Sequence, residues 1–163
     1  MANPTLPVRL LAGLAAGLAG TFVLQGLLAG SGWWAPETLP PIRRDSAEFM
    51  VEQAESALPA ARRAQVPPKG KAAAEKGLQL GYGTTFGVLY GLAAGAGNPL
   101  LAGAVLGLAT WAVGYLGWLP ATGLMPPVTR QEPARVAGPI ATHVGYGIAT
   151  AAAYRWLRRR LER

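Results

Sequence analysis

Four apolar stretches, each about as long as a membrane span, divide this chain of 163 residues. They cover residues 8–28, 77–96, 100–119 and 136–157, and nearly all charged residues lie outside them. Because a helix needs about 20 apolar residues to cross the hydrocarbon core of a bilayer, the pattern predicts four transmembrane helices. The expected fold class is an all-α membrane protein in which residues 1–163 form a single membrane domain.

The first apolar stretch has a second interpretation, because Arg9 followed by an apolar run resembles the start of a secretory signal peptide. The run is longer than the usual signal core of about 7–15 residues, and its end lacks a clear Ala-x-Ala cleavage site. The pair Gly13 and Gly17 instead indicates close packing against another helix. We therefore expect this stretch to be a membrane span.

A glycine recurs at every fourth position of the second stretch, as Gly83, Gly87, Gly91 and Gly95. In water each interior glycine weakens a helix by about 1 kcal/mol relative to alanine. In a bilayer the same ladder lets a second helix backbone approach closely. We expect helix packing at these glycines, and the further packing positions are Gly13, Gly17, Ala141, Gly145 and Ala149.

The long connection over residues 35–76 carries one predicted helix, at about residues 46–58. Asp45 and Glu48 have the spacing of a capping box at its start, and Pro59 ends or kinks it. Its apolar face is compatible with a helix that lies on the membrane surface or docks on the bundle. An ordinary solvated connector is the alternative. Residues 67–71 are expected to form an exposed linker.

The two halves of the chain resemble each other. Leu10–Gly13 recurs as Leu100–Gly103, and Gly81–Gly83 recurs as Gly145–Gly147. The shared order of these matches predicts two similar helical hairpins, which form a parallel internal repeat about an axis along the membrane normal. Such a repeat is equally compatible with a plain four-helix bundle.

The connections predict a topology. Gly97, Asn98 and Pro99 form a tight turn, so we expect the second and third spans to be antiparallel neighbours. Four spans place both termini on one side of the membrane. The arginines that follow the last span favour the cytoplasm for that side.

The formal net charge of +7 indicates basic residues that anchor the spans at anionic headgroups. No aromatic residues interleave with basic ones to stack on bases, so nucleic acid is not an expected partner. The absence of cysteine excludes disulfides and thiolate metal sites. Aromatic and basic side chains at the ends of the apolar stretches are the expected interfacial anchors, namely Trp33, Trp34, Trp118, Arg158, Arg159 and Arg160.

Polar side chains share one face of the second span and one face of the fourth. Matching the halves places Gln79, Tyr82, Phe86 and Tyr90 against His143, Tyr146, Thr150 and Tyr154. Their spacing keeps each set on one side of its helix. These polar groups need partners in a dry environment, so together they form the candidate intramembrane site.

His143 is the only histidine and the only ionisable side chain near the middle of a span, tyrosines aside. An ionisable residue inside a membrane is a functional-site hypothesis by default. The alternative is a packed, neutral histidine that hydrogen-bonds to Tyr82, to Gln79 or to a carbonyl. One histidine with no nearby acid forms no metal site, and its neighbour Thr142 points away from it on a helix. We therefore expect no enzyme activity, no metal and no cofactor.

Short motifs resemble the YagU-like family of bacterial inner-membrane proteins. Residues 34–41 with Arg43 are similar to the first loop of that family, and residues 123–127 followed by His143 are similar to its third loop and fourth helix. Gln79 stands where the family has a more basic polar residue. The resemblance implies a multi-pass protein of the bacterial cytoplasmic (inner) membrane, and it implies no activity or ligand.

Two function classes follow from these observations. The first is a structural or interaction membrane protein, whose partners are the lipid bilayer and either a second copy of the chain or another membrane protein. The alternative is a small transporter or ligand-binding four-helix bundle, with a midplane polar site around His143 and a small-molecule ligand that the sequence leaves unknown.

Overall fold

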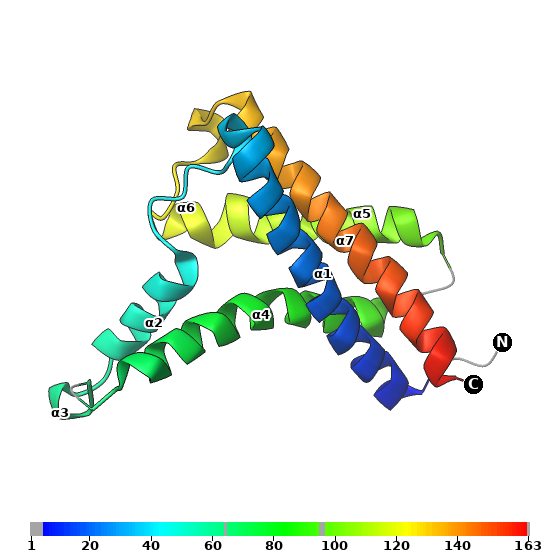
Figure 1. The fold of residues 1–163 in the computed structure, drawn as a ribbon, viewed down its shortest axis with the longest axis horizontal. Helices are drawn as coiled ribbons and strands as arrows, with labels where there is room; N and C mark the ends of the chain where they lie inside the picture. The colour runs from blue at the N-terminus through cyan, green and yellow to red at the C-terminus, as the bar shows by residue number, and fades with distance from the viewer. Residues whose placement is uncertain (1–4, 64, 95–96, 163) are drawn as a thin grey trace.

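Helices build this protein, as the computed structural model shows for residues 5–63, 65–94 and 97–162 (Figure 1). No strand occurs in these described ranges. The four long helices are α1 (Leu6–Trp34), α4 (Pro68–Ala93), α5 (Pro99–Ala112) and α7 (Pro133–Leu161). The shorter elements are η1 (Pro36–Thr38), α2 (Ser46–Ser56), α3 (Ala60–Arg63), η2 (Val113–Trp118), α6 (Leu119–Ala121) and η3 (Val128–Arg130).

Each long helix has a proline at its first or second position. Proline suits this place because its fixed φ matches the helix and its missing N–H would have had no helical partner. Pro68 therefore begins α4, and Lys69 and Lys71 lie in its first turn. Residues 67–70 are exposed as predicted, but the segment is not a linker, because it is helical from Pro68 on.

Two of the helical segments are long and apolar enough to cross a membrane, judged by length and composition. They are α1 and the continuous segment Pro99–Ala121, which joins α5, η2 and α6. Large apolar side chains such as Phe22 and Leu101 are exposed on them. An apolar surface of this kind suits a hydrocarbon environment.

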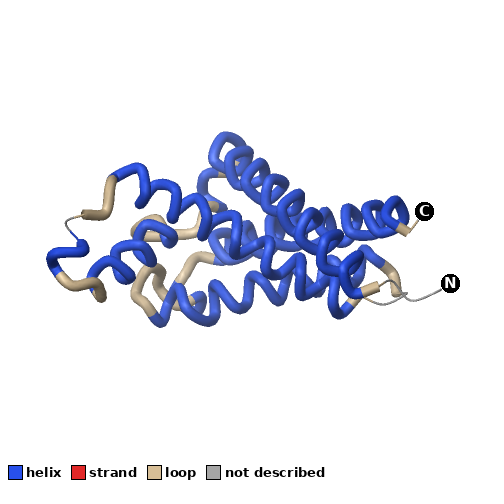
Figure 2. Tube along the Cα trace, turned by 90° about the horizontal axis from the view of Figure 1, so that it is seen from below, coloured by secondary structure: helices blue, strands red, loops and turns tan. Residues whose placement is uncertain are grey.

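The long helices pack in the order α4, α1, α7, α5, and α4 and α5 scarcely touch each other. The start of α1 and the end of α7 lie at one end of the molecule, and α2 and α3 lie at the other (Figures 1 and 2). The turn at Gly97–Pro99 therefore joins two helices that are not packed neighbours, and the prediction that they would be is wrong. The physical reason is that the glycines of α4 face α1, whereas those of α5 face α7.

Glycines bring α1 and α4 into close contact. A Cβ on Gly17 would lie 2.9 Å from the Gly83 carbonyl oxygen and from Gly87 Cα. A Cβ on Gly87 would lie 2.5 Å from the Gly13 carbonyl oxygen. No side chain fits at these distances, so the close approach depends on the glycines themselves. Gly91 is also buried on this face, and Gly95 lies outside the described residues.

The same arrangement recurs between α5 and α7. Gly147 lies against Gly103 and Gly107, as Gly87 lies against Gly13 and Gly17. Matching the sequences pairs Gly147 with Gly83, one helical turn earlier. The two helix pairs thus share a packing geometry in a register that differs from the sequence match by one turn.

The face of α7 that contacts α4 carries tyrosines. Tyr146 Oη donates to the Gly83 carbonyl oxygen at 2.6 Å, and Tyr154 Oη donates to that of Gly91 at 3.1 Å. Both tyrosines are buried, so these bonds satisfy hydroxyls that would otherwise be costly in the interior. The ladder expected at Ala141, Gly145 and Ala149 lies outside this face, because Ala141 is exposed and the other two are half-buried.

Candidate functional site

A cavity of about 540 Å³ opens between α1, α4, η2 and α7, with the start of α2 at its edge. It extends along the second half of α1, from Leu24 to Leu28, and along α4 from Gly77 to Thr85. Most of its walls are apolar. Polar side chains line it at a few points, namely Gln25, Ser46, Gln79, Tyr82, Thr85, Thr110, Tyr115 and His143.

The helix that forms one wall of the cavity departs from α-helical geometry. Val113–Trp118 is π-helical, and Gly117 has φ −100° and ψ −108°, outside the helical region. Gly114, Tyr115 and Trp118 from this segment line the cavity. Single π-turns inside helices occur frequently at functional sites. Here the irregular turn lies next to the only histidine of the chain.

His143 is 8% exposed and lines the cavity. Its Nδ1 lies 2.8 Å from the Pro139 carbonyl oxygen. Because a carbonyl only accepts, this bond assigns the proton to Nδ1 and leaves Nε2 of the neutral ring as an acceptor. The ring also packs edge-on against Tyr115, with 5.5 Å between centroids.

Two threonines in the cavity wall use their hydroxyl protons within their own helices. Thr85 Oγ1 donates to the Gly81 carbonyl oxygen, and Thr110 Oγ1 donates to that of Leu106, both at 2.8 Å. Each hydroxyl oxygen keeps free lone pairs. The exposed Thr85 and the buried Thr110 therefore add hydrogen-bond acceptors to the residues that line the cavity.

Tyr82 and Gln79 also have protein partners. Tyr82 Oη donates to the Thr110 carbonyl oxygen at 3.4 Å. Gln79 Nε2 donates to Asp45 Oδ2 at 3.4 Å, which joins α4 to the start of α2. The cavity edge is thus tied to the long connection by a side-chain bond.

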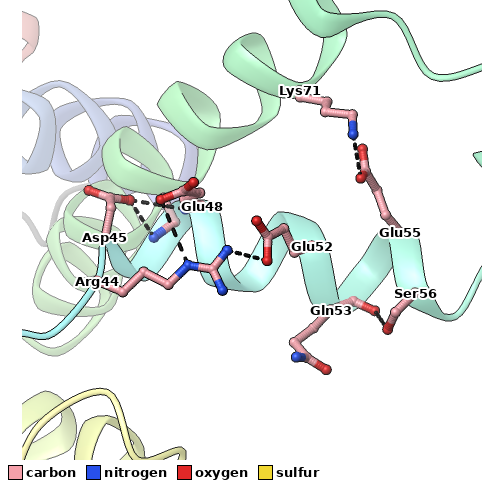
Figure 3. Close-up of polar contacts among 9 residues, drawn as sticks. Arg44, Asp45, Glu48, Glu52, Gln53, Glu55, Ser56 and Lys71 are labelled. Atoms are coloured by element: carbon pink, nitrogen blue, oxygen red, sulfur yellow. Dashed lines mark hydrogen bonds and ion pairs between the residues drawn. The ribbon is translucent and has the colours of Figure 1, made fainter.

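Charged groups hold α2 in place beside the cavity (Figure 3). Asp45 accepts hydrogen bonds from the backbone of Ala47 and Glu48, at 2.8 and 3.0 Å, so it caps the helix as its position predicts. Glu48 does not complete a capping box but lies 3.8 Å from Arg44. Glu52 pairs with Arg44 and raises its pKa through a hydrogen bond.

A second attachment lies at the other end of α2. Lys71 Nζ on α4 lies 2.6 Å from Glu55 Oε2, and the Glu55 side chain is mostly buried. Of the alternatives left open for this segment, the structure shows a helix that docks on the bundle, through α4. The helix ends at Ser56, before Pro59.

Three of the seven predicted site residues line the cavity: Gln79, Tyr82 and His143. The other four lie further along α4 and α7, where Tyr90 packs edge-on against Tyr154 and Tyr146 receives the Thr150 hydroxyl proton at its carbonyl. Sequence reasoning missed Gln25, Ser46, Thr85, Thr110 and Tyr115. Two of these residues, Gln25 and Thr110, could have been found, because each is a polar residue within an apolar stretch.

The expected interfacial anchors differ in exposure. Trp33 and Trp34 are almost fully exposed at the end of α1. Trp118 is half-buried and lines the cavity instead. At the opposite end of the molecule the Arg160 guanidinium lies 5.5 Å from the Trp156 ring, and Arg158 lies 3.6 Å from Glu162. Arg159 is exposed. These positions are compatible with headgroup contacts at both ends.

The chemistry of the cavity is that of binding. Within the described residues, no three His, Cys, Asp or Glu side chains gather in a way that could hold a metal ion. The walls of the cavity are mostly apolar, with a few side chains that can form hydrogen bonds. Such a cavity suits a molecule that is itself partly apolar and partly polar. Comparison with known proteins gives no family model, no curated protein and no solved structure that matches this chain.

Proposed function

We propose that this chain is a multi-pass membrane protein that binds a small amphiphilic molecule in the cavity beside His143. The observation that carries the proposal is the cavity itself, whose volume of about 540 Å³ falls within the range of small-molecule sites. Apolar walls supply affinity, and the few polar groups orient the ligand. The proposal involves no chemical step, so the protein acts as a binding or transport protein rather than an enzyme.

A structural or interaction membrane protein is the second candidate function. The glycine contacts between α1 and α4 and between α5 and α7 favour it, because they form a tightly packed scaffold. A scaffold alone gives no reason for an open cavity bordered by a π-helical turn. This difference makes ligand binding the better supported of the two.

In this proposal the chain crosses the membrane four times, through α1, α4, the segment Pro99–Ala121 and α7. Two features support this proposal. The charged residues of α4 are confined to its first three turns, up to Lys76. The start of α1 and the end of α7 lie at the same end of the molecule. The resemblance to YagU-like proteins supports the bacterial inner membrane as the location. The arginines at the end of α7 support a cytoplasmic position for both termini.

Single cysteines test the number of spans, because the chain has no native cysteine. We expect Gln53→Cys on α2 and Gly97→Cys in the turn before α5 to react with an impermeant maleimide from opposite sides of the membrane. Both positions are exposed, and a side chain at Gly97 meets nothing within 4 Å. Labelling of intact cells and of inverted vesicles shows on which side of the membrane each cysteine lies. If only the two most apolar segments crossed, both cysteines would react from the same side.

His143→Ala tests the cavity. We expect native mass spectrometry of the full chain, released from mild detergent, to show a small molecule on the wild type and about tenfold less of it on the variant, since one lost hydrogen bond and its contacts are worth about that factor. Tyr154→Phe is the matched control, because Tyr154 is buried on the same helix and does not line the cavity. If the wild type, His143→Ala and Tyr154→Phe all carried the same bilayer lipids in the same amounts and no other molecule, the result would support the structural or interaction protein instead.

A further inference from the structure

A second cavity lies beneath α2, on the α4 side. Its volume is about 590 Å³, and its walls are mostly apolar, with Val51 and Ala54 from α2, Leu58 from the turn after α2, and Ala74 from α4. The charges of Glu55 and Lys71 at its border neutralise each other in the 2.6 Å ion pair. This cavity is therefore suited to hydrocarbon rather than to a charged group.

The two cavities meet at a common wall. Met50, Gly77 and Leu78 line both of them. Met50 is 46% exposed and Leu78 is 38% exposed, so neither side chain is fully packed between the cavities. The two cavities therefore adjoin along α4, and together they are called the groove.

The length of this groove indicates the size of its occupant. Its lining residues on α4 run from Gly70 to Thr85, which at 1.5 Å per residue is about 22 Å. Each section alone spans about 12 Å of helix. One acyl chain of a bilayer lipid covers half of the hydrocarbon core, about 15 Å. One section is too short for such a chain with a headgroup, whereas the whole groove is long enough for both.

The polar groups indicate which headgroup fits. Among the described residues that line the first cavity, none is Asp, Glu, Lys or Arg. A buried carboxylate or phosphate would have no cation as its partner, and burial of an unpaired charge is costly. His143 Nε2 and the oxygens of Thr85 and Thr110 can accept hydrogen bonds. The side chains of Gln25, Ser46 and Tyr115 can donate or accept them. A headgroup that both donates and accepts hydrogen bonds fits this lining. An uncharged headgroup with hydroxyls meets both conditions.

We propose that the two cavities form one site for a single-chain amphiphile with an uncharged, hydroxyl-bearing headgroup. The headgroup lies beside His143 in the first cavity, and the chain follows α4 beneath α2 in the second. This proposal rests on the function proposed above and specifies its ligand class. It makes α2 a structural part of the site, because α2 covers the chain.

The test compares a long and a short chain with the same headgroup. Purified full chain in mild detergent is mixed with equal amounts of monooleoylglycerol and mono-octanoylglycerol, and native mass spectrometry gives the ratio of the two bound forms. Leu78→Trp fills the junction of the cavities. We expect Leu78→Trp to lower the ratio of bound monooleoylglycerol to bound mono-octanoylglycerol about tenfold, because a few methylene groups of the long chain would no longer be buried. Met50→Trp, which fills the junction from α2, has the same expected effect.

Leu89→Trp is the control, because Leu89 is exposed on the same helix and lines neither cavity. It should leave the ratio as in the wild type, and comparing proteins cancels the unequal partition of the two esters into micelles. Equal ratios in the wild type and both junction variants would overturn the single groove and leave the proposed function standing. Binding of neither ester would reject the proposed function as well. A parallel measurement uses oleate, which has the same chain and a charged headgroup. If oleate bound as strongly as monooleoylglycerol, the proposal of an uncharged headgroup would be refuted.

Discussion

Gly87→Ala is expected to lower the free energy of unfolding by about 2 kcal/mol, although alanine is the better helix former. The added methyl group would meet the backbone of Gly17 and lie 2.5 Å from the Gly13 carbonyl oxygen. Backbone atoms cannot move aside as a flexible side chain can, so α1 and α4 must separate. Their separation also weakens the hydrogen bond from Tyr146 to Gly83, which lies one turn away on the same face of α4.

Gly81→Ala is the matched control for this variant. Gly81 lies on the same helix, and a Cβ there meets nothing within 4 Å. We expect it to be neutral or to stabilise the protein by up to about 1 kcal/mol. Unfolding by sodium dodecyl sulfate in mixed micelles, followed by far-ultraviolet circular dichroism, measures both. Equal effects at the two glycines would show that helix propensity, and not the α1–α4 contact, decides stability.

Local patterns along the chain were sufficient to predict α2 and most of each long helix. Asp45 caps α2 because a carboxylate that precedes a helix can bind its free N–H groups wherever the helix lies. The ladder at Gly83, Gly87 and Gly91 lies on one face by helical periodicity alone, and that face packs on α1. Such features depend on neighbours within a few residues.

The arrangement of the helices could not be read in the same way. A tight turn at Gly97–Pro99 constrains the ends of two helices and leaves their crossing angle free, so α4 and α5 diverge. Their contacts are set by the glycine faces of α1 and α7, which are far away in sequence. The long connection was expected to end in a linker because residues 67–71 hold two prolines, a glycine and two lysines, but Pro68 begins a helix.

Only three of the polar residues that line the cavity were predicted, two on α4 and one on α7. Gln79, Tyr82 and His143 were found because they are polar residues at helical spacing in apolar stretches. Ser46 and Tyr115 reach the cavity through the docking of α2 and through the π-helical turn. Neither feature has a sequence signal of its own, because both arise from how distant segments pack.

Gly147→Ala is expected to destabilise the α5–α7 pair by about 2 kcal/mol, by the same overpacking. Its added methyl group would meet the Gly103 carbonyl oxygen and lie 2.9 Å from Gly107 Cα. The same micelle unfolding assay measures it. The effect should be as large as that of Gly87→Ala, because each of these two glycines lies against a pair of glycines on its partner helix.

Gly145→Ala, two residues away on α7, decides between two packing faces. The sequence ladder of Ala141, Gly145 and Ala149 predicts that Gly145 lies in the helix contact, so its alanine variant would be the damaging one. In the structure a Cβ on Gly145 meets only Leu27 Cδ1, the end of a flexible side chain that can rotate away. We therefore expect Gly145→Ala to cost less than about 0.5 kcal/mol, the usual limit for a substitution away from a packed contact. The reverse order of the two variants would place the ladder in the interface and reject the packing of α7 on α5 through Gly147.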